Sequence, residues 1–170
     1  MWVFGYGSLI FRPSFPFVER RDAWLPGLAR RLWQASPDHR GVPEAPGRVA
    51  TLVPDPGART WGTAYRIADH DVEEVVLALD HREKNGYERR PVVLETPRGP
   101  VDATVYFAGP SNPSYRGPES DDQVADVVRI AAGPSGSNLD YVAELAAAIG
   151  EAGERDPHVE NVLALATRRR

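Results

Sequence analysis

The sequence carries a glycine-bracketed loop near its start that is suited to holding negative charge. The loop follows a short apolar run at residues 2–4 and consists of Tyr6, Gly7, Ser8 and Leu9. Because glycine permits close backbone approach, the successive N–H groups of these four residues are expected to converge on an anion, as in a backbone nest. Such a nest would bind a carboxylate or stabilise an oxyanion. The plainer alternative is a tight turn or bulge after a first strand.

The loop does not match the common phosphate-binding or nucleophile motifs. Ile10 stands where a dinucleotide fingerprint needs its third glycine, and no Gly-Lys-Ser/Thr sequence follows as it would in a P-loop. Ser8 lies outside a Gly-x-Ser-x-Gly elbow, so its hydroxyl is not expected to be a nucleophile. We therefore expect the loop to act through its backbone amides.

Glu83 is the carboxylate that helical geometry singles out as the chemical partner of this loop. Residues 69–84 predict one amphipathic helix with an apolar stripe. The stripe consists of Val72, Val76 and Leu79, with Val75 beside it. Glu83 continues this stripe, whereas Glu74 lies on the opposite face. Burial and the negative end of the helix dipole both raise a carboxyl pKa, which favours proton transfer near neutral pH. The alternative is a structural glutamate that pairs with an arginine such as Arg82 or Arg89, or that reaches solvent.

Six segments of the chain form an ordered set of motifs: residues 4–10 (FGYGSLI), 33–41 (WQASPDHRG), 46–53 (PGRVATLV), 61–66 (WGTAYR), 79–87 (LDHREKNGY) and 131–136 (AAGPSG). Together these segments resemble the ChaC family of glutathione-specific γ-glutamylcyclotransferases. The match runs nearly end to end. Phe11 and Arg12 stand where family members often have Trp-Lys, and the last dozen residues contribute nothing to the resemblance.

The resemblance implies a reaction in which the α-amine of a γ-glutamyl group attacks its own γ-amide carbonyl. From glutathione the products are 5-oxoproline and cysteinylglycine, and the reaction needs no metal, cofactor or covalent enzyme intermediate. Glu83 is then the expected general acid and base, since one carboxyl with a raised pKa can take the amine's proton and return it to the leaving nitrogen. The amides from Tyr6 to Leu9 would grip the α-carboxylate or stabilise the oxyanion.

Four further side chains are candidate substrate contacts from the resemblance and from their chemistry. Tyr6, Tyr87 and Tyr115 occupy positions that imply contacts with the substrate. The alternative for each is a half-buried tyrosine that packs its ring. Arg40 has the forked guanidinium that binds a carboxylate through two hydrogen bonds; a salt bridge to Asp38 or another acid is equally compatible with the sequence.

Composition restricts the cellular role of the chain. The net charge is −4, which gives no reason to expect a nucleic acid or an anionic membrane as partner. The absence of cysteine excludes disulfides and thiolate nucleophiles, and the four histidines form no metal-binding pattern. No signal peptide or apolar stretch of membrane length is visible, so a cytoplasmic location is expected.

Short strand-like runs dominate the first two-thirds of the chain, and helices follow. The predicted strands are residues 2–6, 28–33, 47–53, 60–67, 91–95 and 101–107. Residues 55–59 read as a hairpin loop, residues 121–132 as a helix, and Asn138 as the cap of a second late helix. This order favours an α+β fold in a single domain over residues 1–170. The family resemblance implies a closed, mixed β-barrel flanked by helices.

Two other functions agree with the same residues. A related enzyme would cyclise a different γ-glutamyl donor with the same glutamate and loop, and only the leaving half of the substrate would differ. A non-enzymatic protein would bind a γ-glutamyl ligand or a protein partner in its barrel without turnover. A core-facing carboxyl at Glu83 argues against the second function, because a pure binding module gains nothing from a buried acid.

Overall fold

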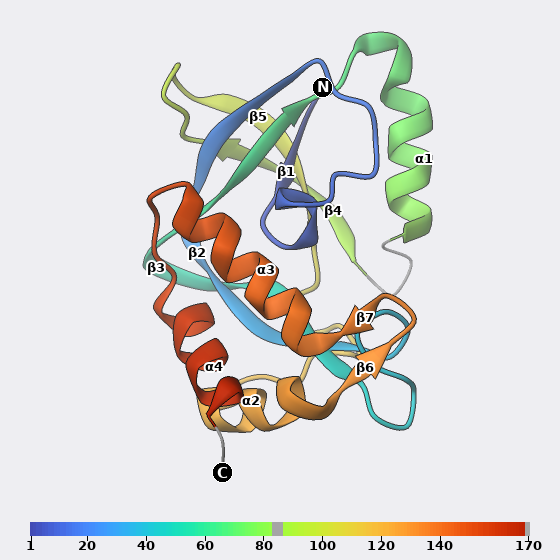
Figure 1. The fold of residues 1–170 in the computed structure, drawn as a ribbon. Helices are drawn as coiled ribbons and strands as arrows, with labels where there is room; N and C mark the ends of the chain where they lie inside the picture. The colour runs from blue at the N-terminus through green and yellow to red at the C-terminus, as the bar shows by residue number, and fades with distance from the viewer. Residues whose placement is uncertain (83–86, 169–170) are drawn as a thin grey trace. The chain divides into compact units, whose positions relative to one another are not determined.

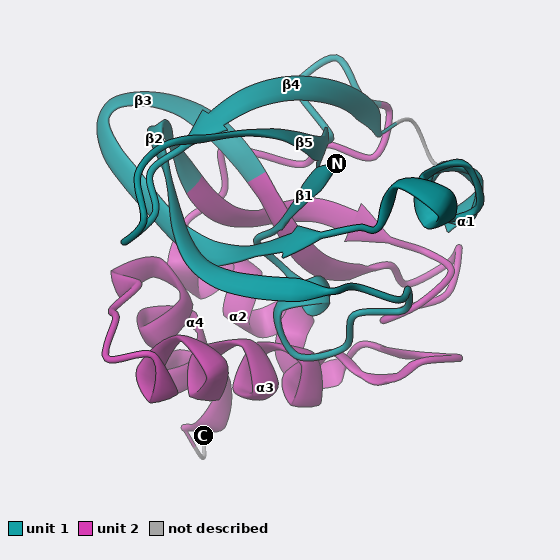
Figure 2. Ribbon diagram, turned by 90° about the horizontal axis from the view of Figure 1, so that it is seen from above, with its two compact units in different colours: residues 1–29, 52–112 teal, residues 30–51, 113–170 magenta. Residues whose placement is uncertain are grey.

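The computed structural model describes residues 1–82 and 87–168, and these divide into two compact units. Unit 1 comprises residues 1–29 and 52–112, and unit 2 comprises residues 30–51 and 113–170 (Figure 2). Two long strands contribute residues to both units. The prediction of one domain over residues 1–170 stays a prediction, and each unit is described by itself below.

The described residues form strands and helices in a mixed order along the chain (Figure 1). The strands are β1 (Trp2–Gly5), β2 (Glu19–Ser36), β3 (Gly47–Arg66), β4 (Glu88–Leu94), β5 (Val101–Phe107), β6 (Ala132–Gly133) and β7 (Gly136–Ser137). The α-helices are α1 (Val72–Arg82), α2 (Asp121–Ile130), α3 (Asn138–Glu151) and α4 (Pro157–Thr167), and the short 3-10 helices are η1 (Ser8–Ile10) and η2 (Asp69–Asp71).

The main sheet is mixed and open. Its strand order is β2-β3-β1-β5-β4. β1 pairs antiparallel with β3 and parallel with β5, and β5 pairs antiparallel with β4. Trp24 of β2 and Glu95, the residue after β4, form one isolated bridge. Closing a barrel needs a continuous ladder between the edge strands, so the expected closed barrel is wrong. The α+β class with a mixed sheet and helices is confirmed.

The long strands β2 and β3 differ from the sequence prediction. Two predicted strands, residues 47–53 and 60–67, are joined in β3, which runs through the predicted hairpin loop at residues 55–59. Arg59, within that stretch, pairs with Glu95 at 2.9 Å and stacks over the Trp24 ring at 4.5 Å. Pairing with β2 and these side-chain contacts outweigh the local turn propensity of Pro and Gly, which sequence windows overestimate.

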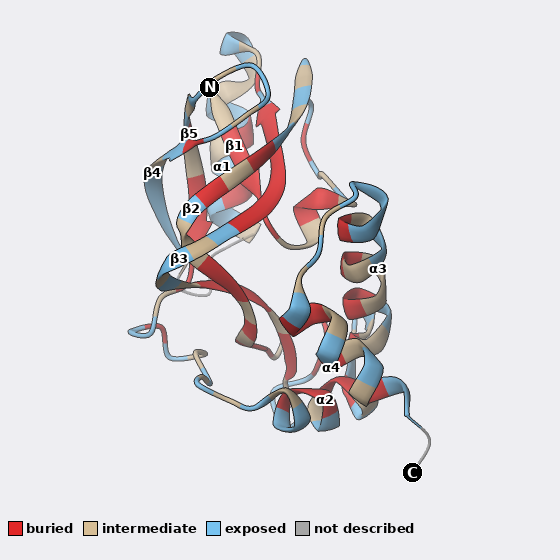
Figure 3. Ribbon diagram, turned by 90° about the vertical axis from the view of Figure 1, so that its left-hand side faces the viewer, coloured by how far each residue is buried: buried red, intermediate tan, exposed pale blue. Residues whose placement is uncertain are grey.

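The core of unit 1 packs α1 against the sheet, and the buried positions are red in Figure 3. Its cluster consists of Val3, Leu9, Phe15, Tyr65, Ile67, Val75, Leu79 and Tyr106. α1 is most buried at Val75 and Leu79, both 1% exposed, whereas Val76 is only partly buried. The apolar stripe is therefore rotated toward Val75, the residue that the sequence placed beside it. Periodicity gives the face of a helix, and packing decides its centre.

Unit 2 is built around three helices that pack on one another, α2, α3 and α4. α2 begins at a capping box in which Ser120 and Gln123 bond reciprocally. α3 is capped by Ser137, because Asn138, the expected cap, lies inside the helix and is fully buried. α4 was not expected from the sequence. Its start nevertheless carries a familiar signal, a capping Asp156 followed directly by proline.

Candidate active site

The loop after β1 turns back closely on the end of that strand. β1 ends at Gly5, and a Cβ at that position would lie 2.8 Å from the Leu9 Cβ, so glycine allows the chain to fold back closely. The turn of η1 is closed by hydrogen bonds from the amides of Ile10 to Arg12, which use the carbonyls of Gly7 and Ser8. We call residues 6–14 the β1 loop.

Three amides of the β1 loop remain available to a ligand. Within residues 1–82 and 87–168, no group accepts a hydrogen bond from the backbone N–H of Gly7, Ser8 or Leu9. Gly7 and Ser8 are partly exposed to solvent. Successive N–H groups of this kind carry positive partial charge and favour an anion. Whether these three amides bind an anion as a nest stays a prediction.

Two tyrosine hydroxyls, those of Tyr65 and Tyr6, fix the β1 loop to the rest of unit 1. The Tyr65 hydroxyl donates to the Leu9 carbonyl at 2.7 Å and lies 3.2 Å from the Ile10 carbonyl. Burial raises the pKa of Tyr65, so its hydroxyl stays a protonated donor. The Tyr6 hydroxyl donates to the Tyr106 carbonyl at 2.9 Å, and Tyr6 is only 7% exposed. Tyr6 thus anchors the start of the loop in the core.

The Ser8 hydroxyl is engaged by an arginine rather than by a base. Arg82 donates from Nη2 to Ser8 Oγ at 2.7 Å and from Nη1 to Ser14 Oγ at 2.9 Å. A nucleophilic serine needs an adjacent base to take its proton, and a guanidinium cannot do that. This contact agrees with the expectation that Ser8 acts through its backbone.

The predicted general acid and base, Glu83, lies outside the described residues. Arg82 is the last described residue of α1, and it is the residue whose side chain reaches the β1 loop. The two arginines that the sequence offers as alternative partners for Glu83 have contacts of their own. Arg89 Nε lies 3.5 Å from Asp80 Oδ1, and Arg82 binds the two serines described above.

Tyr87 is the candidate substrate contact that the structure brings near the β1 loop. Its partly buried side chain packs against the core cluster that contains Leu9 of the loop and Leu79 of α1. The loop, the buried face of α1 and Tyr87 therefore share one region of unit 1. Whether Tyr87 contacts a substrate stays a prediction.

Arg40 belongs to unit 2, where its side chain is buried and already held. It is 5% exposed, its Nη1 donates to the Ser137 carbonyl at 3.1 Å, and its guanidinium lies 5.5 Å from the Tyr141 ring centre. Asp38 is not its partner; Asp38 Oδ2 lies 3.8 Å from His39 Nε2. Among the described parts of the chain, no carboxylate forms an ion pair with Arg40. Its role toward a substrate carboxylate stays a prediction.

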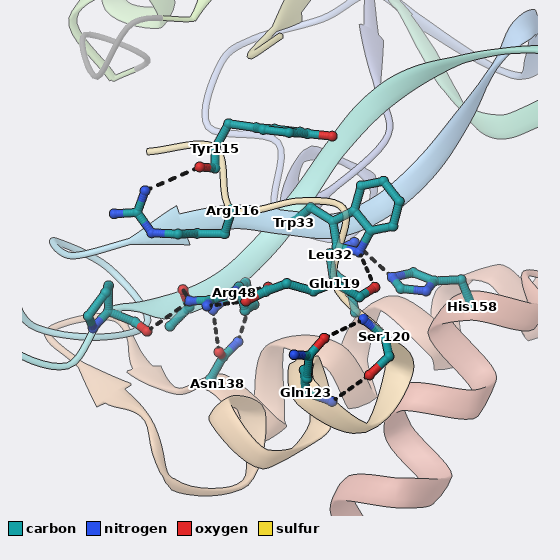
Figure 4. A network of polar contacts seen from close by, with 12 residues as sticks. Leu32, Trp33, Arg48, Tyr115, Arg116, Glu119, Ser120, Gln123, Asn138 and His158 are labelled. Carbon is teal, nitrogen blue, oxygen red and sulfur yellow. Dashed lines mark hydrogen bonds and ion pairs between the residues drawn. The ribbon is translucent and has the colours of Figure 1, made fainter. Parts of the chain in front are cut away.

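Tyr115 also belongs to unit 2, beside the end of β2. It forms an isolated bridge with Gln34, and its ring meets the Trp33 ring edge to face with centres 6.4 Å apart (Figure 4). Burial raises the pKa of Tyr115, so its hydroxyl is a proton donor at neutral pH. The structure describes Arg40 and Tyr115 within unit 2 and the β1 loop within unit 1.

Sequence reasoning named Arg82 only as an alternative partner of Glu83, and it did not name Ser14. Arg82 follows Leu79 by three positions, which places it beside the buried face of the helix, so its spacing was a usable signal. Ser14 gave no signal, because its contact joins residues 68 positions apart.

No helix among the described residues is long and apolar enough to cross a membrane.

The sequence is similar to known proteins along most of its length. A family model described as ChaC-like protein matches residues 1–169. A glutathione-specific γ-glutamylcyclotransferase 1 from Rattus norvegicus is 37% identical over 170 residues, covering 96% of this chain and 77% of that protein. A glutathione-specific γ-glutamylcyclotransferase from Saccharomyces cerevisiae is 35% identical, and the match covers 89% of this chain and 86% of that protein.

Solved structures show the same fold. The crystal structure of a γ-glutamylcyclotransferase specific to glutathione from yeast has a TM-score of 0.93 at 32% identity, covering 98% of this chain and 95% of that chain. A second structure, titled γ-glutamyl cyclotransferase, has a TM-score of 0.56 at 16% identity and supports the fold alone. With a family match over nearly its whole length and relatives above 30% identity, this chain belongs to the ChaC-like family.

Proposed function

We propose that this chain degrades glutathione by cyclising its γ-glutamyl group, with release of 5-oxoproline and cysteinylglycine. Relatives at 35% and 37% identity that carry this activity in their names support the proposal. The observation on this chain that carries it is the row of three amides, at Gly7, Ser8 and Leu9, that no described residue uses. An enzyme for this reaction needs such donors for a carboxylate or an oxyanion.

The reaction balances within the substrate. The lone pair of the glutamyl α-amine forms a bond to the γ-carbonyl carbon, and the bond from that carbon to the cysteine nitrogen breaks. The amine gives up a proton, and the leaving nitrogen gains one. We assign both transfers to Glu83, because a single carboxyl can accept the first proton and donate it in the second step. The reaction consumes no water.

The β1 loop would lower the barrier in either of two ways. Amides on the α-carboxylate would hold the glutamyl chain in the folded conformation that closes the ring, which replaces a conformational search with a fixed geometry. Amides on the γ-carbonyl oxygen would stabilise the negative charge of the tetrahedral state, where one donor is typically worth about 10²-fold to 10³-fold in rate. Tyr6, Tyr87, Tyr115 and Arg40 are the side chains we propose to contact the substrate.

The absence of cysteine fits a protein that handles a thiol peptide, because the chain offers no thiol for exchange with its substrate. A cytoplasmic location belongs to the same proposal, since glutathione is abundant in that reducing compartment.

The test is to incubate the purified chain with glutathione and to measure 5-oxoproline and cysteinylglycine by mass spectrometry. We expect both products in equal amounts. Parallel incubations with a γ-glutamyl amino acid and a γ-glutamylamine test the alternative donors, because only the leaving group differs. Binding of glutathione without either product would support the non-catalytic alternative and contradict the proposal.

A further inference from the structure

One guanidinium connects α1 to two points of the β1 loop. Arg82 uses Nη2 for Ser8 Oγ at 2.7 Å and Nη1 for Ser14 Oγ at 2.9 Å. The two serines are near the start and at the end of the loop, so the arginine bridges it. Arginine suits this task because its donors lie in one rigid plane, whereas the ammonium of lysine is a single point of charge.

Ser8 is the central residue of the loop's hydrogen-bond pattern. Its carbonyl accepts from the amides of Phe11 at 3.3 Å and Arg12 at 2.8 Å, and its hydroxyl accepts from Arg82. Its own amide is the middle donor of the row from Gly7 to Leu9, from which no described residue accepts a hydrogen bond. A shift of Ser8 would therefore turn the donors of the whole row.

The helix that carries Arg82 is itself fixed to the sheet. The Tyr106 hydroxyl of β5 donates to Asp80 Oδ1 at 2.7 Å, one turn or less before the end of α1. Val75 and Leu79 bury the same helix in the core. Arg82 thus reaches the loop from an anchored helix, and the bond from the Tyr106 hydroxyl that anchors it does not involve Ser8 or Ser14.

We propose that Arg82 is a positioning residue whose forked contact with Ser8 and Ser14 holds the amides of Gly7, Ser8 and Leu9 in the arrangement that binds the anionic part of the substrate. Arg82 acts through the loop and has no chemical step of its own. The catalytic consequence rests on the proposed function, whereas the structural coupling does not.

The kinetic test compares variants at both ends of the contact. Arg82→Gln should lower kcat/KM for glutathione by about tenfold, because misplaced donors cost rate even without a change in chemistry. Arg82→Lys should remain closer to Arg82→Gln than to the parent, since one ammonium cannot span both serines. The double variant Ser8→Ala with Arg82→Gln should be little worse than Arg82→Gln alone, because both changes remove one interaction.

Tyr106→Phe is the matched control. It removes the hydroxyl that bonds to α1, at 2.7 Å from Asp80 Oδ1 and 3.5 Å from the Val76 carbonyl, and it keeps the backbone carbonyl that accepts from Tyr6. It should lower the melting temperature and leave kcat/KM within about twofold of the parent, as expected for a contact outside the active site. An equal loss of kcat/KM in Tyr106→Phe, or a fully active Arg82→Lys, would overturn the proposal in favour of general helix anchoring or of charge alone.

Hydrogen exchange separates the positioning role from the proposed activity. In Arg82→Gln the amides of Ile10, Phe11 and Arg12 should exchange about tenfold faster, because the turn they close opens more often, whereas Tyr106→Phe should leave them unchanged. If the parent makes no 5-oxoproline but this pattern appears, the proposed function fails and the positioning role stands. Unchanged exchange in Arg82→Gln contradicts the positioning role, whatever the parent turns over.

Discussion

The β1 loop of unit 1 and the turn at residues 36–41 of unit 2 share residue types, but their backbone amides differ in hydrogen bonding. We call the second segment the Arg40 turn. In the β1 loop, the amides of Gly7, Ser8 and Leu9 have no acceptor within the described residues. In the Arg40 turn, the Arg40 amide donates to Ser36 Oγ at 3.0 Å.

Glycine has a different task in each region. A Cβ on Gly41 would lie 2.2 Å from the Gly47 nitrogen, and one on Gly133 would lie 2.4 Å from the Gly41 carbonyl oxygen. Backbone there packs on backbone, so a side chain at either glycine would not fit. Directly before the β1 loop, Gly5 lets the chain fold back closely onto Leu9. Backbone N–H and C=O groups that have partners are typical of a structural region, whereas N–H groups without an acceptor are typical of a binding site.

A polar network of Asn138, Arg48 and Glu119, also in unit 2, extends this contrast. Asn138 accepts from the Arg48 amide at 2.6 Å and donates to the Arg48 carbonyl at 2.7 Å, so its side chain continues the backbone pairing of β3 (Figure 4). Arg48 itself binds Glu119 through two nitrogens, at 2.7 Å and 2.8 Å. We therefore expect changes in this network to affect stability, and changes near the β1 loop to affect turnover.

The largest effect is expected at Glu83. Glu83→Gln keeps the volume and a polar side chain but cannot accept the amine's proton, so kcat should fall by roughly 10²-fold to 10⁴-fold with the fold retained. Steady-state release of 5-oxoproline measures it. Glu74→Gln is the control, because Glu74 is exposed in the first turn of α1 and should keep a near-parental rate. A folded Glu83→Gln protein with the parent rate would refute the assignment.

The next largest effect distinguishes the role of the β1 loop backbone from the role of the Ser8 hydroxyl. Gly7→Val adds a branched side chain beside the available amides and should lower kcat/KM by about 10²-fold, since small displacements of binding groups are costly. Ser8→Ala should cost less, because it removes only the contact with Arg82. Enzyme kinetics on both variants measure the difference. A covalent glutamyl adduct on Ser8, seen by mass spectrometry, would contradict this order.

A change in the network of unit 2 should affect stability alone. Asn138→Ala leaves the buried amide and carbonyl of Arg48 without their partners, which should lower the free energy of unfolding by about 3 kcal/mol. Urea denaturation measures this loss, and the rate per folded molecule should stay unchanged. Asn161→Ala is the control, because Asn161 is exposed and donates one 3.2 Å hydrogen bond to Asp121. A fall in turnover without a fall in stability would break the contrast between the regions.

The smallest effect concerns pH and His158. Its Nε2 accepts from the Leu32 amide at 2.9 Å (Figure 4), and its Nδ1 lies 2.8 Å from Asp121 Oδ1. Burial lowers the pKa of His158, and this outweighs the opposite effect of Asp121. Protonation of Nε2 would break the bond to Leu32, so the folded protein favours the neutral ring.

The sign of the pH dependence follows from proton uptake. Because the folded pKa of His158 lies below its unfolded value, the unfolded chain binds more protons and stability falls as the pH drops below about 6.5. The stabilisation is fully present above that pH. The parent should therefore lose more melting temperature than His158→Gln on acidification from about pH 7.5 to about pH 5.5. Parallel melting curves for the two proteins would disprove this role of the imidazole.

Local patterns in the sequence predicted much of this fold and part of its site. β5 has the predicted bounds, and α2 begins at the predicted residue, because alternation and capping are local signals. The β1 loop was also predicted, since glycines beside a short strand indicate an amide-lined turn. The hairpin loop at residues 55–59 was wrong because pairing between strands far apart in sequence overrides turn propensity.

The sequence alone determined the residue types that the proposed chemistry needs: the glycine-bracketed loop, a glutamate that helical periodicity predicts to continue an apolar stripe, and the absence of thiols. Only the tertiary structure decided that Arg82 reaches Ser8 across 74 positions and that Tyr65 holds the Leu9 carbonyl across 56. It also decided that the sheet stays open. The physical reason is the sequence separation over which each interaction acts. Periodicity and capping depend on neighbours within a few residues, whereas these contacts depend on which distant segments the burial of apolar surface brings together.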